Sequence, residues 1–460
     1  MLLQKPAFLL FYHARAAEAS FGEWLGVLWH GLSLDCTVAG YVTAFPVLVV
    51  LASFWIPLSQ RVWRIVLTVY FSLIALVTAA IFAVDLNLYG YWGFRLDGSV
   101  LIYLSDPGEA LASASWGEVL RQILIMLVYA GAMIWSYRWI LRLFRVEPVP
   151  LRGRIVPTVA TLLIGGLTFL AIRGGVTVAT ANVSKVYFSS NMFLNHAATN
   201  PVFSFLSSVG DNENYAEAYP FFEEERRKTL FEELRGNRPG ADAGTPRLLR
   251  SDRPNVVLIL LESFGRTIMD ETVNGEPVMP NMQRFKREGV WFENFFANSF
   301  RTDRGQVAVL CGFPAQTTMS IMKLPRKSAT LPSLARSLGR EGYRSVFMYG
   351  GDLNFTNQAS FMYSTGWEEL IWQKDMQLDA PTSKWGYADD VVVDLFGDEV
   401  EALGRAEQPF LAGLLTLSSH EPFEVPFAKF DDKLLNAMAF SDAQIGRLID
   451  RLRESPGTIY

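Results

Sequence analysis

The chain has 460 residues, enough for two or three domains, and half of them are hydrophobic. Its mean hydropathy of +0.19 is high for a soluble protein, and the excess lies in the first 175 residues. From Ser251 onward there are 28 acidic and 21 basic residues, a net charge of −7 that excludes a typical nucleic-acid partner.

Four charge-poor segments predict transmembrane helices in an α-helical membrane domain over residues 1–175. They are residues 36–57, 62–86, 119–144 and 155–172, each close to the roughly 20 residues that cross a bilayer. Arginines crowd the loops between the first two and between the last two segments, whereas the middle loop holds one arginine and three acidic residues. The positive-inside rule therefore predicts a multi-pass protein of the cell (inner) membrane, with everything after Arg173 on the extracytoplasmic, or periplasmic, side.

The regions that flank these helices are less regular. Pro6–Tyr12 is apolar but too short to span, so it is either an interfacial segment or the remnant of a longer helix. Residues 176–253 are expected to form a juxtamembrane segment, a charged connecting helix at residues 219–234 and a linker at residues 236–246 that is dense in glycine and proline.

Beyond Pro254, apolar strands and helices alternate. The pattern predicts strands at residues 255–261, 344–348 and 409–416, and helices at residues 282–288, 303–310, 331–341, 387–403 and 431–453. Such alternation is typical of a mostly parallel sheet with helices on both faces. We therefore expect residues 254–460 to form an extracytoplasmic α/β domain.

Two polar residues follow apolar runs in positions that favour chemistry. Glu262 ends the run that starts at Asn255, at the carboxyl end of a predicted buried strand, where open α/β sheets bind their ligands. Thr302 precedes the apolar stretch Val307–Leu310 at a predicted helix start, where free N–H groups favour an anion. A carboxylate and a hydroxyl facing an anion site suggest metal-assisted attack on a phosphoryl or sulfuryl group, although Thr302 could also be a simple helix cap.

The outer domain resembles the sulfatase-like branch of the alkaline phosphatase superfamily, and within it the membrane proteins of the lipoteichoic acid synthase type. The matching pieces occur in the family's order over about 200 residues. They are Asn255-Val-Val-Leu-Ile-Leu-Leu-Glu-Ser-Phe264, Met279-Pro-Asn-Met282 with Glu288-Gly289, Arg301-Thr-Asp-Arg-Gly305, Gly312-Phe-Pro314, Gly342-Tyr343, Tyr349-Gly-Gly-Asp352 and Thr416-Leu-Ser-Ser-His420.

The resemblance implies roles for several residues. Glu262 and Thr302 would hold one divalent cation, Mn²⁺ or Mg²⁺, and Thr302 would also be the nucleophile that carries a covalent phospho-intermediate. His420, the only histidine after His196, would contact the phosphoryl substrate and exchange a proton with a leaving group or acceptor, unless it is only structural. Arg301 and Arg304 could bind a phosphate or simply pair with Asp303.

Further residues are ambiguous or depart from the family pattern. Asp352 is a candidate substrate ligand in a Gly-Gly-Asp turn, but the turn alone explains it equally well. Cys311 lacks the Cys-x-Pro-x-Arg setting of true sulfatases, which favours a buried thiol that has no disulfide partner in Cys36. Thr356 and Gln358 stand where lipoteichoic acid synthases place a tryptophan and an arginine.

The sequence contains no Asp-His dipeptide, although the family completes its metal site with such a pair. The chain is then either a fragment that would bind metal poorly or a protein that lacks half of the metal shell.

The resemblance implies a membrane-anchored, metal-dependent transferase that moves a phosphoglycerol-type group through a threonine intermediate. The donor would be a membrane lipid resembling phosphatidylglycerol, and the acceptor an envelope glycan or glycolipid. Two alternatives stay open. One is a phosphoethanolamine transferase or a phospho- or sulfo-ester hydrolase on the same scaffold, and the other is a non-catalytic pseudoenzyme that serves as an envelope binding or sensing module.

Overall fold

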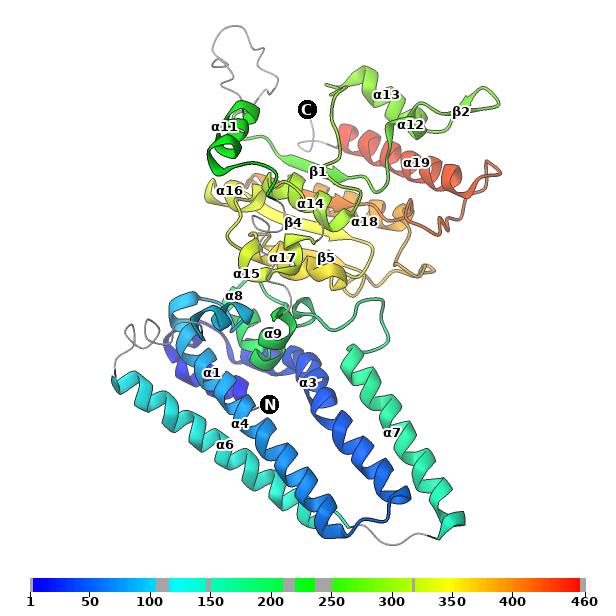
Figure 1. Cartoon of the computed structure of the whole chain (residues 1–460). Helices are drawn as coiled ribbons and strands as arrows, with labels where there is room; N and C mark the ends of the chain where they lie inside the picture. The colour runs from blue at the N-terminus through cyan, green and yellow to red at the C-terminus, as the bar shows by residue number, and fades with distance from the viewer. Residues whose placement is uncertain are drawn as a thin grey trace.

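The computed structural model describes residues 3–104, 116–145, 150–209, 220–235, 249, 251–316 and 319–455. Figure 1 shows a bundle of long helices joined through several short helices to an α/β domain. The predicted linker at residues 236–246 lies outside the described residues.

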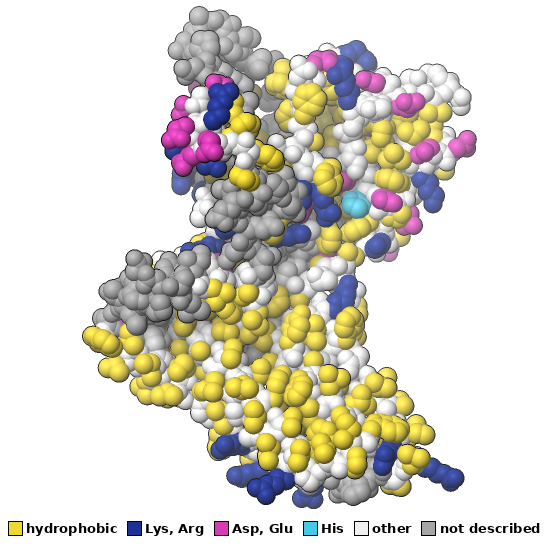
Figure 2. Space-filling view, in the orientation of Figure 1, with side chains coloured by type: hydrophobic (Ala, Val, Ile, Leu, Met, Phe, Trp, Pro, Cys, Tyr) yellow, Lys and Arg dark blue, Asp and Glu magenta, His cyan; other side chains and the backbone are white. Residues whose placement is uncertain are grey.

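Four helices of the bundle are long and apolar enough to cross a membrane, as the sequence predicts. They are α3 (Phe21–Trp55), α4 (Gln60–Trp92), α6 (Trp116–Leu143) and the segment Leu151–Arg173, which joins η2 (Leu151–Arg154) to α7 (Ile155–Arg173). Figure 2 shows hydrophobic side chains over most of the bundle surface, with lysine and arginine side chains gathered at the end away from the α/β domain.

Helix α3 begins at Phe21, 15 residues before the predicted span of residues 36–57. Its start is fixed by a capping box, in which the Ser20 hydroxyl accepts a hydrogen bond from the Glu23 N–H at 3.3 Å and the Glu23 carboxylate accepts one from the Ser20 N–H at 2.7 Å. The hydropathy pattern missed this first part because Glu23, His30 and Asp35 interrupt the apolar run.

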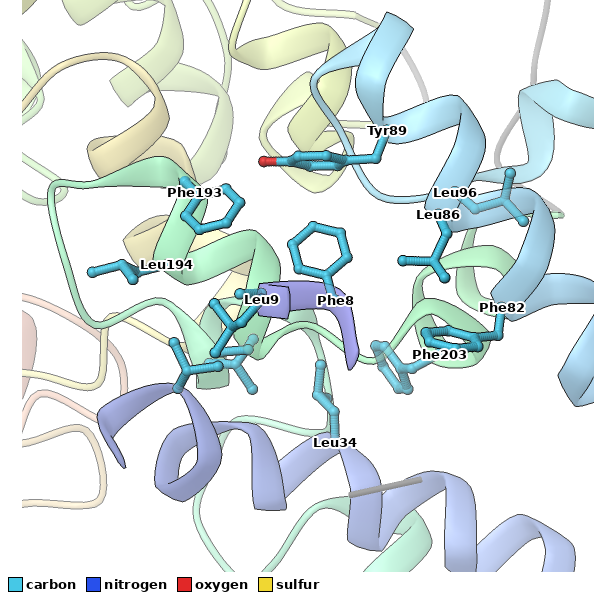
Figure 3. Close-up of a cluster of buried hydrophobic side chains, with 14 of the residues drawn as sticks. Phe8, Leu9, Leu34, Phe82, Leu86, Tyr89, Leu96, Phe193, Leu194 and Phe203 are labelled. Atoms are coloured by element: carbon cyan, nitrogen blue, oxygen red, sulfur yellow. The ribbon is translucent and has the colours of Figure 1, made fainter. Parts of the chain in front are cut away.

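Short helices pack across the end of the bundle that faces the α/β domain. They are α1 (Gln4–Phe11), α2 (His13–Ala16), η1 (Gly98–Leu104), η3 (Val183–Val186), α8 (Met192–Ala198) and α9 (Pro201–Ser208). Figure 3 shows their core, in which Phe8 of α1 lies among side chains of α4 and α8. The apolar segment Pro6–Tyr12 is therefore part of a packed core.

Two ion pairs are buried in this same region. Lys5 Nζ lies 2.6 Å from Asp35 Oδ2, and Asp35 also accepts a hydrogen bond from the Asn200 amide at 2.7 Å. Arg95 Nη2 lies 3.1 Å from Asp85 Oδ2, and both side chains are at most 4% exposed. The loss of one partner from such a pair leaves an uncompensated buried charge. The first pair therefore holds α1, α3 and the start of α9 together, and the second fixes the chain that follows α4 against that helix.

The α/β domain is built on a four-stranded parallel sheet in the order β1-β6-β4-β5. The strands are β1 (Val256–Leu260), β4 (Arg344–Tyr349), β5 (Glu369–Trp372) and β6 (Phe410–Leu415). Strand β5 was not predicted, and a small antiparallel hairpin of β2 (Thr272–Val273) and β3 (Glu276–Pro277) lies apart from the main sheet.

Helices cover both faces of the sheet, and alternate residues of each inner strand face opposite layers. In β4, Val346 and Met348 pack with α18 (Asp389–Gly404) and α19 (Lys433–Glu454), whereas Phe347 and Tyr349 pack on the other face. The helices of that other face include α14 (Thr302–Cys311), α16 (Leu334–Arg340) and α17 (Gln358–Ser364). The predicted α/β sandwich is confirmed.

The remaining elements connect these layers. They are α11 (Glu224–Arg235), α12 (Arg266–Met269), α13 (Pro280–Glu288), η4 (Ile321–Lys323), α15 (Pro325–Ser328) and η5 (Phe355–Asn357). The apolar stretch at residues 290–296 forms no regular element, and Phe292, Phe295 and Phe296 are more than 70% exposed.

A buried histidine predicts how the fold depends on pH. His196 of α8 is almost fully buried, with Nδ1 3.1 Å from the Tyr89 hydroxyl, and its ring also contacts Tyr187. Burial, followed by the charges of Arg95 and Arg15, lowers the pKa of His196 to about 3. The unfolded chain therefore binds a proton between its ordinary pKa of 6.5 and pH 3 that the folded chain does not.

We expect the contribution of neutral, buried His196 to the free energy of unfolding to be complete above pH 6.5 and to be lost as the pH falls toward 3. At pH 5 the folded state should lose about 2 kcal/mol relative to pH 7. Thermal unfolding of the detergent-solubilised chain at pH 7.5 and pH 5 measures the loss, and His196→Gln should reduce the difference. An equal pH dependence in the wild type and the variant would contradict the assignment.

Candidate active site

Glu262 and Thr302, predicted as one site, lie in direct contact. Glu262 follows the carboxyl end of β1, and its backbone N–H donates to the Thr416 hydroxyl at 2.8 Å. Thr302 is the first residue of α14, and its hydroxyl donates to Glu262 Oε2 at 2.9 Å. Residues 40 positions apart thus meet at the carboxyl edge of the sheet.

The hydroxyl of Thr302 is not used to cap its helix. Arg301 occupies the N-cap position and offers no side-chain cap, so the predicted boundary is shifted by one residue. Thr302 therefore lies among the first N–H groups of α14, where the helix dipole favours negative charge. This arrangement leaves the threonine oxygen turned toward Glu262.

The two arginines that flank Thr302 have different surroundings. Arg301 is half exposed, and its Nε lies 3.7 Å from Asp303 Oδ1, so the predicted pairing with Asp303 is present. Arg304 is partly buried, with its guanidinium over the Phe300 ring at 5.8 Å from the centroid.

A buried carboxylate that the sequence reading overlooked holds the loop after β6. Asp389 accepts hydrogen bonds from the N–H groups of Leu417 at 2.7 Å and Ser418 at 3.2 Å, and from the Ser441 hydroxyl at 2.6 Å. Burial raises the pKa of Asp389, and these hydrogen bonds oppose the rise. The loop is further joined to β1 because Ser419 Oγ donates to the Glu262 carbonyl at 2.6 Å.

His420 ends this loop with one ring nitrogen engaged. Its Nδ1 lies 2.8 Å from the Glu421 carbonyl oxygen. Because a carbonyl only accepts, we assign the proton to Nδ1, which leaves Nε2 available to exchange a proton. The ring packs on Trp385 at 4.5 Å between centroids, and the Trp385 indole N–H donates to the same carbonyl at 2.8 Å.

Trp385 reaches His420 because two glycine-containing segments pack closely. A Cβ on Gly351 would lie 2.8 Å from the Trp385 carbonyl oxygen, and one on Gly386 only 2.1 Å from the Gly350 carbonyl oxygen. The sequence reading attributed Gly350 and Gly351 to a tight turn, whereas the structure requires them for backbone contact. This contact exists only in the folded chain, so the sequence carries no local signal for Trp385.

The other candidates near the turn have mainly structural contacts. Asp352 Oδ1 accepts a hydrogen bond from the Asn354 N–H at 2.9 Å, and its charge also acts on half-buried Lys185. Gln358 is buried and accepts a hydrogen bond from the Gln306 amide at 3.0 Å. Thr356 has a positive φ of 53° and lines a cavity on the bundle side.

Two oxygen-bearing side chains, Glu262 and Thr302, could contribute to a cation site. A carboxylate and a hydroxyl are hard ligands that suit Mg²⁺ or Mn²⁺. Within the residues that the structure describes, no group of three or more His, Cys, Asp or Glu side chains could hold a metal. The described residues thus offer a cation two oxygen-bearing side chains, Glu262 and Thr302, and no third His, Cys, Asp or Glu ligand beside them.

Cys311 lies apart from this chemistry. It is 6% exposed at the end of α14, and burial raises the pKa of its thiol to about 11. Both Cys311 and Cys36 are free thiols. A protonated, packed thiol agrees with the structural role that its sequence setting predicts.

Comparisons with known proteins place this geometry in a family. Residues 254–457 match the family model named Sulfatase. They form a sulfatase-family domain. Over 228 residues the chain is 35% identical to phosphoglycerol transferase I of Xanthomonas campestris pv. campestris. This match covers 44% of this chain and 32% of that protein.

Two further similarities concern the same domain. Lipoteichoic acid synthase 1 of Bacillus subtilis is 30% identical over 191 residues, or 37% of this chain and 27% of that protein. A solved alkaline phosphatase superfamily protein from Vibrio parahaemolyticus superposes with a TM-score of 0.42 at 28% identity, covering 45% of this chain and 52% of that one. The chain thus spans about a third of the length of the curated relatives that it matches.

The role of Asp389 in the sulfatase-family domain gives a stability prediction. Asp389→Ala removes the acceptor of two buried backbone N–H groups and should lower the free energy of unfolding by roughly 3–5 kcal/mol. Thermal unfolding followed by circular dichroism measures the change. Asp394→Ala, which removes a pair with Arg447 that is about half exposed, should have little effect. Equal losses in both variants would show that Asp389 does not organise the loop.

Proposed function

We propose that this protein is a membrane-anchored, metal-dependent transferase that moves a phosphoglycerol-type group through a covalent bond to Thr302. The donor is a membrane lipid resembling phosphatidylglycerol, and the acceptor is a cell-envelope glycan or glycolipid. The observation that carries the proposal is the 2.9 Å hydrogen bond between Thr302 and Glu262 at the start of α14. The names of the relatives support the class of group transferred.

The proposed reaction has two balanced halves. In the first, a bond forms between Thr302 Oγ1 and phosphorus while the bond from phosphorus to the diacylglycerol oxygen breaks. In the second, an acceptor hydroxyl attacks the same phosphorus and the threonine oxygen leaves. In the first half the proton of the Thr302 hydroxyl passes to the diacylglycerol oxygen, and in the second half the proton of the acceptor hydroxyl passes to the Thr302 oxygen.

Side chains of this protein would orient the Thr302 hydroxyl and exchange protons with the attacking and departing oxygens. Glu262 fixes the Thr302 hydroxyl, and the first N–H groups of α14 favour the charged phosphoryl oxygens. Nε2 of His420, which carries no proton at the start, takes the proton of the attacking hydroxyl and gives it to the departing oxygen in each half. A divalent cation held by Glu262 and Thr302 would lower the pKa of the hydroxyl and reduce the charge on the phosphoryl group.

The proposed topology places this site beside its lipid. Arginine-rich loops lie at the far end of the bundle from the α/β domain, which supports a cytoplasmic location for those loops. The α/β domain is then on the periplasmic side of a multi-pass protein. A lipid donor reaches it without leaving the bilayer.

Intact mass spectrometry tests the proposed intermediate. The full chain is incubated with Mn²⁺ and phosphatidylglycerol, and we expect an adduct of phosphoglycerol mass on the wild type. Thr302→Ala should abolish it because the accepting oxygen is gone, while Thr302→Ser should retain it at a reduced level.

The site of attachment distinguishes the outcomes. Peptide mapping should place the added mass on Thr302, and Ser263→Ala serves as the control for a neighbouring hydroxyl. An adduct that persists in Thr302→Ala would refute the nucleophile. The absence of any adduct with phosphatidylglycerol, phosphatidylethanolamine or cardiolipin would favour a binding module instead.

A further inference from the structure

A cavity of about 800 Å³ lies between the short helices of the bundle and the α/β domain. One wall comes from the chain after α4 and from α8 and α9, and the other comes from η4, α15 and η5. Figure 1 shows these elements facing one another at the junction of the two parts. The cavity is thus at one end of the helices that are long and apolar enough to cross a membrane.

The lining is strongly cationic. It contains five basic side chains, from Arg95, Arg301, Lys323, Arg326 and Lys327, and the single carboxylate of Asp97. Arg326 already has partners, because it lies 3.3 Å from Asp97 and over the Trp92 ring at 4.4 Å. Arg95 and Arg301 pair with Asp85 and Asp303, which are not among the lining residues. Among the described residues, Lys323 and Lys327 are the lining cations for which no carboxylate lies within ion-pair distance.

Arg95 supplies the most specific feature of the wall. It is 5% exposed, and only its Nη2 is paired with Asp85. Its Nε and Nη1 have no hydrogen-bond partner among the described residues, and its guanidinium lies over the Phe8 ring at 4.2 Å from the centroid. Buried donors of this kind are costly unless an acceptor reaches them, and an anionic oxygen is the acceptor that suits a guanidinium.

The cavity also has an apolar part and a connection to the proposed catalytic residues. Phe94, Phe203 and Leu324 contribute apolar surface beside the cations. Arg301 in the lining directly precedes Thr302. On another side, the lining residue Phe355 packs on Trp385 at 5.5 Å, and Trp385 packs on His420.

We propose that this cavity binds the phosphodiester headgroup of an anionic membrane phospholipid, with Arg95, Lys323 and Lys327 facing the phosphate. The inference rests on the proposed function and extends it, because it makes the membrane part of the chain one half of the donor site. The apolar part of the wall receives the glycerol and the start of the acyl chains, and the phosphorus lies on the side of Arg301 and Thr302.

The test measures lipid binding separately from transfer. The full chain carrying Thr302→Ala is delipidated in detergent and titrated with dioleoylphosphatidylglycerol by native mass spectrometry. Lys323→Gln with Lys327→Gln should weaken binding about tenfold, because two exposed cations are removed without disturbing a buried pair. Lys433→Gln, an exposed lysine at the start of α19, is the matched control and should bind as the parent does.

Two further titrations identify the source of the phosphate. Dioleoylphosphatidylcholine, which has no net charge, should bind more weakly than phosphatidylglycerol and show little dependence on the two lysines. Soluble glycerol 1-phosphate should bind at least tenfold more weakly than the lipid. Equal binding of the double variant and the Lys433→Gln control would overturn the proposal, and so would equal affinity for the soluble phosphate.

Failure of this inference can be told apart from failure of the proposed function. If lysine-dependent lipid binding occurs but the wild type forms no adduct, the proposed lipid site is supported and the proposed transferase activity is refuted. If the double variant forms the Thr302 adduct with the same dependence on lipid concentration as the wild type, the proposed transferase activity is supported and the proposed lipid site is refuted.

Discussion

The candidate site depends on the parallel pairing of β1 with β6. This pairing sets Leu260 beside Leu415, so the two chains leave the sheet at the same edge and carry Glu262 and the loop to His420 with them. The edge is closed by hydrogen bonds on both sides, from the Glu262 N–H to Thr416 and from Ser419 to the Glu262 carbonyl. A shift in register would separate these groups, because each contact joins residues more than 150 positions apart.

A second constraint on the site is the buried carboxylate of Asp389, at the start of α18. Asp389 is buried without a cationic partner and remains in place because three donors reach it, two of them backbone N–H groups of the loop after β6. A buried carboxylate that is satisfied in this way fixes the conformation of what it binds, since few other arrangements would supply as many donors. Asp389 therefore shapes the loop that carries His420 without being one of the proposed catalytic residues.

The sequence predicted the larger elements and the Glu262–Thr302 contact, because both follow from local patterns. Buried strands are apolar runs, membrane helices are long and charge-poor, and polar residues after parallel strands converge at one edge. Strand β5 was missed because Glu369–Trp372 is short, and the start of α3 was missed because polar residues interrupt its hydropathy. Asp389 and Trp385 act through contacts that are distant in sequence, and no local pattern reveals them.

The charged groups of the bundle end also explain why the two parts of the chain form one site. Arg95 is buried beside Asp85, yet two of its guanidinium nitrogens have no hydrogen-bond partner among the described residues, and the residue lines the cavity beside the α/β domain. Arg326 joins the parts from the opposite side through Asp97, and Asn182 donates to the Asn354 carbonyl at 2.8 Å across the same junction. A headgroup bound there would complete a charge balance that neither part provides alone, so lipid binding and the docking of the two parts should strengthen one another.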